Sequence, residues 1–193
     1  FQTGVLSTNS VSASVGGDKG SFRVSASHIY QKGLVPNTSV NNSSFSVGGN
    51  YALTPKLNID TKLTFNREYS NNYPTTGYGS QNILYNLILW IGADVDIRDL
   101  KNYWLPGKEG LQQRNYNLSW YNNPYFIAYQ LLNGYRKDNT YGQATLTYQF
   151  NKDFSLKFRN GFNEYSVDQD YKEPESYIQT SGAISRGNYS VTK

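Results

Sequence analysis

Residues 57–65 read LNIDTKLTF, and apolar and polar side chains alternate along this stretch. Its apolar residues, Leu57, Ile59, Leu63 and Phe65, fall on one face of an extended chain, and the even-numbered residues between them are polar. Alternation with a period of two is typical of a β-strand whose two faces meet different surroundings. The segment therefore predicts a strand with one apolar and one polar face.

The same alternation recurs along the chain and predicts an all-β fold. The six expected strands cover about residues 5–16, 21–31, 43–53, 57–69, 140–150 and 154–163. Most are about nine to eleven residues long, which is the length that a tilted strand needs to cross a bilayer.

The links between these strands alternate between short and long. Short links of turn-forming residues lie at 17–20, 54–56 and 151–153, and long ones at 32–42, about 70–139 and 163–188. This order predicts a partial antiparallel transmembrane β-barrel with short periplasmic turns and long extracellular loops. Aromatic residues at strand ends favour the same interpretation: Tyr30, Tyr51, Tyr69 and Phe150.

A soluble β-sandwich would show the same alternation, because its apolar face points inward and its polar face meets water. On the barrel interpretation, the polar face turns toward a lumen. The residues expected there are Asp60, Lys62, Gln143, Gln149, Lys157 and Arg159.

Composition excludes several kinds of site and disfavours one class of partner. The 193 residues include no Cys, which excludes disulfides, thiolate metal sites and a Cys nucleophile. The chain also lacks Met and begins at Phe1 without a signal-peptide pattern, so we expect 1–193 to be a processed or excised piece of a barrel domain. The net charge of +4 comes from scattered single residues, which disfavours a nucleic-acid partner.

The link at 70–139 is too apolar to be an unstructured loop. Residues 83–91, ILYNLILWI, predict a short helix with Asn82 as its N-cap, and residues 125–132, after Pro124, predict a second. We therefore expect a folded extracellular cap.

Several chemical sites can be weighed and set aside. Asp94, Asp96 and Asp99 superficially resemble a calcium loop, but Asp99 occupies the position that needs glycine. Capping and solvation of a loop segment, with Arg98 pairing with one of the acids, is therefore favoured. His28 is the single histidine, and no serine–acid arrangement accompanies it. No two carboxylates are spaced as an acid and a base. We expect no enzyme activity, no metal and no cofactor.

All three tryptophans lie in the cap. Aromatic faces over an aqueous cavity can stack on sugar rings or contact peptides, and such residues can equally form the small core of the cap. The candidates for partner or substrate contact are Trp90, Trp104, Trp120, Tyr121 and Tyr125.

Residues 10–51 contain Ser12-x-Ser14-x-Gly16-Gly17, a short turn, then Ser25 and later Gly33. This order resembles the early barrel strands of SusC/RagA-type TonB-dependent transporters. Three positions depart from the family pattern: Phe22 and His28 replace Tyr, and Lys32 replaces an acidic residue. Residues 82–104 and the Asn-Pro-Tyr at 123–125 are similar to the long loop of that family.

The resemblance implies about six strands of a 22-stranded barrel in the outer membrane of a Gram-negative bacterium of the Bacteroidota type, with no plug domain in this chain. It implies nutrient uptake of oligosaccharides or peptides, with membrane lipid, the remaining strands, the plug, the TonB system and a SusD-like surface lipoprotein as partners. Two alternatives stay open. One is a SusC-like structural subunit of a secretion or barrel-insertion complex, and the other is a secreted glycan-binding β-sandwich.

Overall fold

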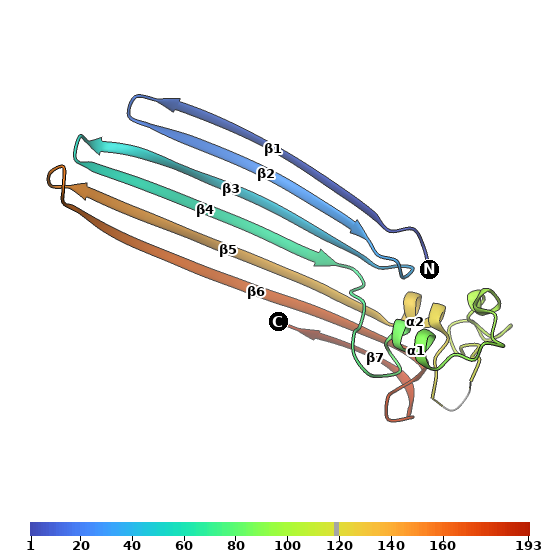
Figure 1. Ribbon diagram of the computed structural model, residues 1–193. Helices are drawn as coiled ribbons and strands as arrows, with labels where there is room; N and C mark the ends of the chain where they lie inside the picture. The colour runs from blue at the N-terminus through green and yellow to red at the C-terminus, as the bar shows by residue number, and fades with distance from the viewer. Residues whose placement is uncertain (118–119) are drawn as a thin grey trace.

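The structure is a computed structural model, and it describes residues 1–117 and 120–193. Seven strands form one antiparallel sheet in the order β1 to β7, so each strand pairs with its neighbours in the sequence (Figure 1). The all-β class is confirmed. The strands are β1 Val5–Gly17, β2 Gly20–Lys32, β3 Ser39–Thr54, β4 Leu57–Ser70, β5 Leu132–Gln149, β6 Ser155–Ile178 and β7 Ile184–Thr192.

The helices lie in the link between β4 and β5. They are α1, Ile83–Leu89, a 3-10 helix, Ile97–Lys101, and α2, Pro124–Gln130. The side chain of Asn82 accepts a hydrogen bond from the backbone N–H of Tyr85 at 3.1 Å, which confirms the predicted N-cap of α1. Both predicted helices are therefore present.

Three strands are longer than the alternation predicted. β3 begins at Ser39 instead of residue 43, so the expected long link at 32–42 is wrong, because only residues 33–38 join β2 to β3. β5 begins at Leu132 instead of residue 140, and β6 continues to Ile178 instead of ending at 163. The expected long link at 163–188 is wrong, because the second half of β6, a five-residue link at 179–183 and the seventh strand, β7, occupy it. Among the links at the end of the sheet opposite its short turns, only the one at 71–131 is long.

The missed strand segments carry charges that pair across the sheet. Arg67 of β4 donates two hydrogen bonds to the carboxylate of Asp138 on β5, at 2.7 and 2.8 Å, and Arg136 of β5 pairs with Asp168 of β6. These polar residues stand on the face that is apolar elsewhere. Alternation of apolar and polar residues is therefore absent in these segments, because both faces of the strand carry polar side chains there.

The register brings the apolar residues of neighbouring strands side by side. Val47 lies opposite Val24 on one side and Leu63 on the other. Val24 and Val47 are half-buried by their neighbours, but most of the apolar face stays exposed; Val11 is 70% exposed and Phe158 62%. The exposed members of this apolar face are Val11, Val15, Phe22, Phe45, Tyr51, Leu63, Phe65, Leu146, Tyr148, Leu156, Phe158 and Phe162.

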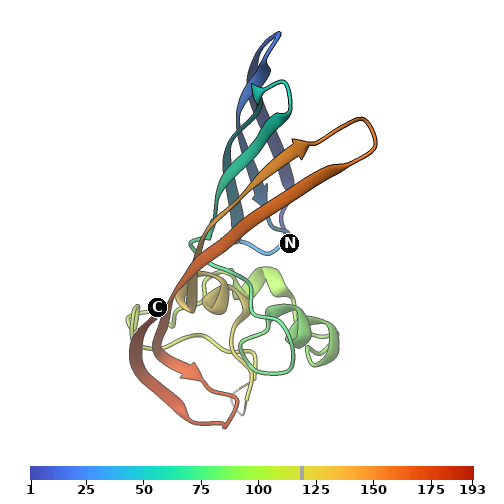
Figure 2. The ribbon, with the colours of Figure 1, turned by 90° about the vertical axis from the view of Figure 1, so that its left-hand side faces the viewer.

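The buried apolar cluster lies at the end of the sheet that carries the long link. Phe126, Ile127, Leu131 and Tyr177 form it, and Tyr171 of β6 packs against it. Tyr171 stands on the polar face of the sheet because it shares the parity of the polar β6 residues. The cap therefore folds over the polar face at one end, while the hairpins extend away from it as a single layer (Figure 2).

Both edges of the sheet are open. Within the described residues, β1 pairs only with β2, and β7 pairs with β6 only from Gln169 to Ile178. Residues 155–168 of β6 thus have a strand on one side alone. The sheet is not closed, and a complete barrel would need further strands.

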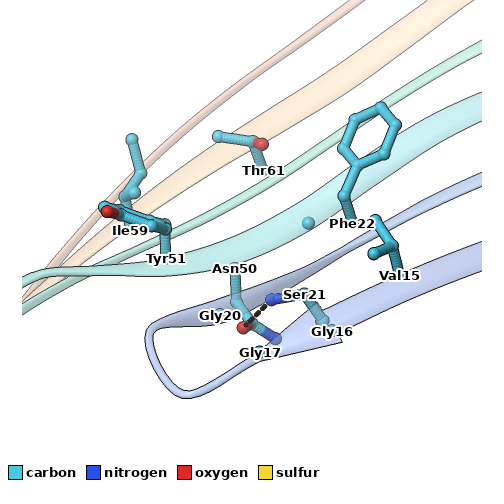
Figure 3. A pocket seen from close by; sticks show the side chains of 11 residues that line it. Val15, Gly16, Gly17, Gly20, Ser21, Phe22, Asn50, Tyr51, Ile59 and Thr61 are labelled. Atoms are coloured by element: carbon cyan, nitrogen blue, oxygen red, sulfur yellow. Dashed lines mark hydrogen bonds between the residues drawn. The ribbon is translucent and has the colours of Figure 1, made fainter.

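The apolar face carries an open hollow of about 540 Å³ near the turn between β1 and β2 (Figure 3). Gly49 is one of the residues that line it, and Phe22, Tyr51 and Ile59 stand around it. A Cβ at Gly49 would lie 2.5 Å from the carbonyl oxygen of Ser21. The glycine is therefore required by the close approach of β2 and β3.

Candidate functional site

The cap, residues 71–131, is organised around Asn123, whose side chain is completely buried. Its Oδ1 accepts hydrogen bonds from the backbone N–H groups of Tyr125 at 2.9 Å and Phe126 at 3.3 Å, so it caps α2. Its Nδ2 donates to the carbonyls of Leu100 at 2.9 Å and Arg114 at 2.8 Å. One amide thus joins α2 to two other segments of the cap.

Asn122 and Gln113 attach the cap to the end of β6. The amide of Asn122 donates to the carbonyl of Ile178 and accepts from the N–H of the same residue, both at 2.8 Å. Gln113 donates to Asn122 Oδ1 at 2.8 Å and to the carbonyl of Ser176 at 2.6 Å. Ser176 has a φ of 65°, and the contacts with Gln113 stabilise this unfavourable backbone conformation.

A third buried amide attaches the cap to the other strands. Asn72 donates to the carbonyls of Asn37 at 3.2 Å and Ala128 at 3.1 Å, and it accepts from the N–H of Asn133 at 3.2 Å. Asn37 lies in the link between β2 and β3. The cap is therefore held at several points along the end of the sheet, which confirms the prediction of a folded link.

Trp104 belongs to the interior of the cap. Its ring meets Phe126 edge-on at a centroid distance of 5.3 Å and lies 5.5 Å from the ring of Tyr103. Both Trp104 and Tyr103 pack against the buried cluster. Trp104 therefore belongs to the packed interior of the cap, and its role in partner or substrate contact stays a prediction.

Trp90, Trp120 and Tyr121 come together in one aromatic surface cluster. The ring centroids of Trp90 and Tyr121 are 6.1 Å apart, and those of Trp120 and Tyr121 are 5.1 Å apart. Tyr78 and Tyr85 extend the cluster, with ring distances of 5.9 Å from Tyr78 to Trp120 and 6.3 Å from Tyr85 to Trp90. We call these five residues the aromatic cluster.

The aromatic cluster is open to solvent at two of its rings: Tyr78 is 69% exposed and Trp90 48%. The indole N–H of Trp120 donates to the carbonyl of Thr180 at 3.0 Å, which anchors its ring to the β6–β7 link. Tyr116 stacks on Tyr121 at 6.0 Å, and burial raises the pKa of Tyr116 to about 12. The cluster thus offers exposed ring faces on a fixed support.

Tyr125 lies apart from this cluster. It lines a small cavity of about 40 Å³ together with Phe1, Val35 and Leu87. The sequence predicts Tyr125 as a contact residue beside the tryptophans, whereas the structure places Tyr78 and Tyr85 next to Trp120 and Trp90. Tyr85 is on α1 five residues before Trp90, and Tyr78 precedes the helix, so no local spacing indicated that their rings would meet.

Two charged residues of the cap, Asp96 and Arg98, have a structural role. Arg98 donates to Asp96 at 2.6 Å, and this hydrogen bond lowers the pKa of Asp96 to about 2. Asp96 also caps the 3-10 helix by accepting from the N–H of Arg98 at 2.9 Å. The interpretation of this Asp-rich segment as capping and pairing is confirmed. In the part of the chain that the structure describes, no three His, Cys, Asp or Glu side chains gather as metal ligands do.

His28 stands on the apolar side of β2, as its position in the sequence predicts. Its Nδ1 shares a hydrogen bond of 2.9 Å with the hydroxyl of Ser43 on β3. Ser43 in turn lies opposite Arg67 in the sheet. The histidine belongs to the polar row that borders the apolar face.

No protein-family model matches this chain, and no curated protein matches it at a significant level. The resemblance in the sequence motifs therefore stays a prediction. No helix among the described residues is long and apolar enough to span a membrane.

Proposed function

We propose that this sheet is a section of the wall of an outer-membrane β-barrel, in which the apolar face contacts lipid. The supporting observation is the exposed apolar face, which extends from β1 to β6 while the cap packs on the opposite, polar face. A soluble β-sandwich would cover such a face with a second sheet. The described residues form one sheet only, and no second sheet among them covers the apolar face.

The dimensions of the apolar face support this proposal. From Leu57 to Phe65 the chain advances about 27 Å, at roughly 3.4 Å per residue. A tilt of about 40° reduces this to about 21 Å, close to the apolar band of roughly 25 Å in outer-membrane barrels. Beyond Phe65 the same face carries Arg67, Asp138 and Arg136. Charges on this face therefore begin where the strands would leave the hydrocarbon.

Within such a barrel, we assign the cap to the extracellular side and the short turns to the periplasmic side. The motif resemblance then favours a SusC-like transporter that imports oligosaccharides or peptides with a SusD-like lipoprotein. The aromatic cluster would contact the substrate or that lipoprotein, because exposed indole and phenol rings bind sugar faces and peptide side chains.

The wall assignment can be tested with spin labels in the full-length protein. Labels replace Leu63 on the apolar face or Gln143 on the polar face, since both positions lie at the same level of the sheet. Oxygen, which concentrates in lipid, should relax the label at 63 more strongly than the label at 143. Equal relaxation at the two positions would rule out the assignment.

The cap assignment needs a second experiment. Deleting residues 83–125 should abolish lipoprotein association and uptake, and Tyr78→Ala with Trp90→Ala should weaken both without unfolding the cap. Leu111→Ala is the matched control, because Leu111 is 63% exposed and lies outside the aromatic cluster. Unchanged association and uptake in the deletion variant would refute a role in contact.

A further inference from the structure

A cavity of about 160 Å³ lies where the cap meets the end of the sheet. Three segments that are far apart in the sequence contribute to its wall: the β2–β3 link, the chain from residue 72 into the start of α1, and the end of α2. Among the described residues that line it, none belongs to the aromatic cluster. The cavity is therefore a separate site from the surface that we assign to contact.

The deep part of this cavity is apolar. Four of its lining residues are buried hydrophobic side chains: Val35, Ile127, Ala128 and Leu131. Tyr73 and Leu84 also line it but are each 42% exposed, so they stand at its mouth. No charged residue is among the described residues of its wall. A charged guest would therefore lose its hydration without gaining an ion pair.

Three polar residues of the wall already have hydrogen-bond partners within the protein. Thr38 donates its hydroxyl proton to the carbonyl of Val35 at 2.7 Å. Asn82 donates to the carbonyl of Gly77 at 2.7 Å and caps α1 with its oxygen, and the amide of Asn72 makes the hydrogen bonds described above. To bind these groups, a sugar would have to displace existing contacts, whereas an apolar molecule leaves them in place. The other polar side chains of the wall are half-buried or exposed, so they can keep their contacts with water: Tyr73, Thr75, Thr76 and Gln81.

The size of the cavity and the residue at its mouth favour a single ring. An apolar cavity of about 150 Å³ holds a molecule the size of benzene, and this one has about 160 Å³. The ring of Tyr73 packs against the ring of Tyr135 at a centroid distance of 5.6 Å. A ring in the cavity can therefore contact both the buried aliphatic side chains and the ring of Tyr73.

We propose that this cavity binds a small, uncharged molecule built around one apolar ring, and that this guest holds the cap closed. The wall segments separate when the cap opens, so the guest binds the closed cap alone and stabilises it by mass action. Ile83 and Leu84 of α1 line the cavity, while Tyr85 of the same helix belongs to the aromatic cluster. The guest thus makes the support of the aromatic cluster more rigid without touching its rings.

The inference goes beyond the proposed function and does not depend on it, since the cavity is formed by contacts of the cap with itself and with the end of the sheet. The spin-label comparison of positions 63 and 143 tests the barrel wall, and the cap variants tested above concern contact with a partner. Failure of the proposed function and failure of this inference therefore give different results.

The test uses fluorobenzene as the probe, on the full-length protein in lipid nanodiscs, with hydrogen exchange followed by mass spectrometry as the readout. Fluorine NMR first gives the Kd of the protein for fluorobenzene. At a free concentration ten times this Kd, amides of α1 and α2 should exchange about ten-fold more slowly, while amides of β2 to β4 should be unaffected. Benzoate, which has the same ring and a negative charge, should not slow the exchange.

Two variants connect the effect to the cavity. Ala128→Leu fills the cavity and should abolish the slowing; Ala183→Leu is the matched control, because Ala183 is exposed in the β6–β7 link and lies outside the cavity. Val35→Ala enlarges the cavity without adding volume to the packed interior. In this variant the Kd for p-xylene, divided by the Kd for fluorobenzene, should fall at least about three-fold relative to the unsubstituted protein.

Four results would overturn the inference. The absence of any slowing by fluorobenzene would show that another part of the protein already fills the cavity. Equal slowing in Ala128→Leu and Ala183→Leu would show that the probe acts through the lipid. Equal slowing by benzoate would show that the site does not select uncharged molecules, and an unchanged ratio of Kd values in Val35→Ala would show that the ring binds elsewhere.

Discussion

Replacing Asn123 by Ala should open the cap while leaving the sheet intact. The substitution removes the N-cap of α2, which costs about 1 kcal/mol. It also leaves the carbonyls of Leu100 and Arg114 without their donor, and each such loss in a buried setting costs about 1–3 kcal/mol. We expect the free energy of opening the cap to fall by about 3 kcal/mol or more, taking the lower estimate for each group.

Hydrogen exchange followed by mass spectrometry in the full-length protein measures this effect. Amides in α1 and α2 should exchange more than about 100-fold faster, since every 1.4 kcal/mol is about tenfold in the opening equilibrium. Amides in β2 to β4 should be unaffected. Asn123→Ser keeps an oxygen that caps the helix but lacks the two donors, so it should recover about 1 kcal/mol.

Asn102→Ala is the control, because Asn102 is exposed in the same cap. If Asn123→Ala accelerates exchange no more than Asn102→Ala does, the buried amides do not hold the cap together. In that case the aromatic packing around Phe126 would be the main source of its stability.

Three further outcomes are expected. Gly49→Ala should lower the stability of the purified full-length protein by about 2 kcal/mol in thermal melts, because the new Cβ would lie 2.5 Å from the carbonyl oxygen of Ser21. Gly16→Ala is the control and should change the stability little, because the nearest atom is 3.8 Å away. Equal losses in the two variants would contradict this explanation. The side chains of Arg67 and Asp138 are 44% and 22% exposed, so solvent and salt should screen their attraction. A double-mutant cycle should give a coupling free energy below about 1 kcal/mol that declines with salt concentration. A larger coupling that does not depend on salt would show that lipid shields this pair. The pKa of Tyr116 is raised from 10 to about 12, so the closed cap keeps the phenol proton at pH values where an opened cap loses it. The stability of the cap should therefore fall as the pH rises from 10 through about 12. In ultraviolet titration, Tyr116→Phe should remove one late-titrating tyrosine, and an unchanged titration curve would exclude the assignment.

Much of the sheet could be predicted from local patterns. Strand existence followed from alternation at Leu57 to Phe65 and its repeats, and α1 followed from an apolar run after Asn82. Prediction failed where the alternation stopped. The first eight residues of β5 and the second half of β6 are rich in charged and polar residues. They pair with neighbouring strands through ion pairs: Asp138 of β5 with Arg67 of β4, and Asp168 of β6 with Arg136 of β5.

The sequence predicted which residue types occur in the candidate site but not how they are arranged. Aromatic residues in the cap were visible, but their division into a core around Trp104 and a surface cluster around Trp90 depends on contacts between separate segments of the cap. Asn122 and Asn123 are adjacent in sequence, yet one binds Ile178, 56 residues away, and the other Leu100. No local signal specifies such contacts.

The sequence alone determined that each strand has one apolar and one polar face, because side chains alternate strictly along an extended backbone. Tertiary structure decided which residues share those faces across strands, and it placed the cap on the polar side while the apolar side stayed open. It also gathered on one surface the cations that are scattered along the chain as Arg23, Lys62 and Arg159. The reason is physical: periodicity is a property of neighbours in the chain, whereas register, burial and charge clustering depend on hydrogen bonds between residues far apart in it.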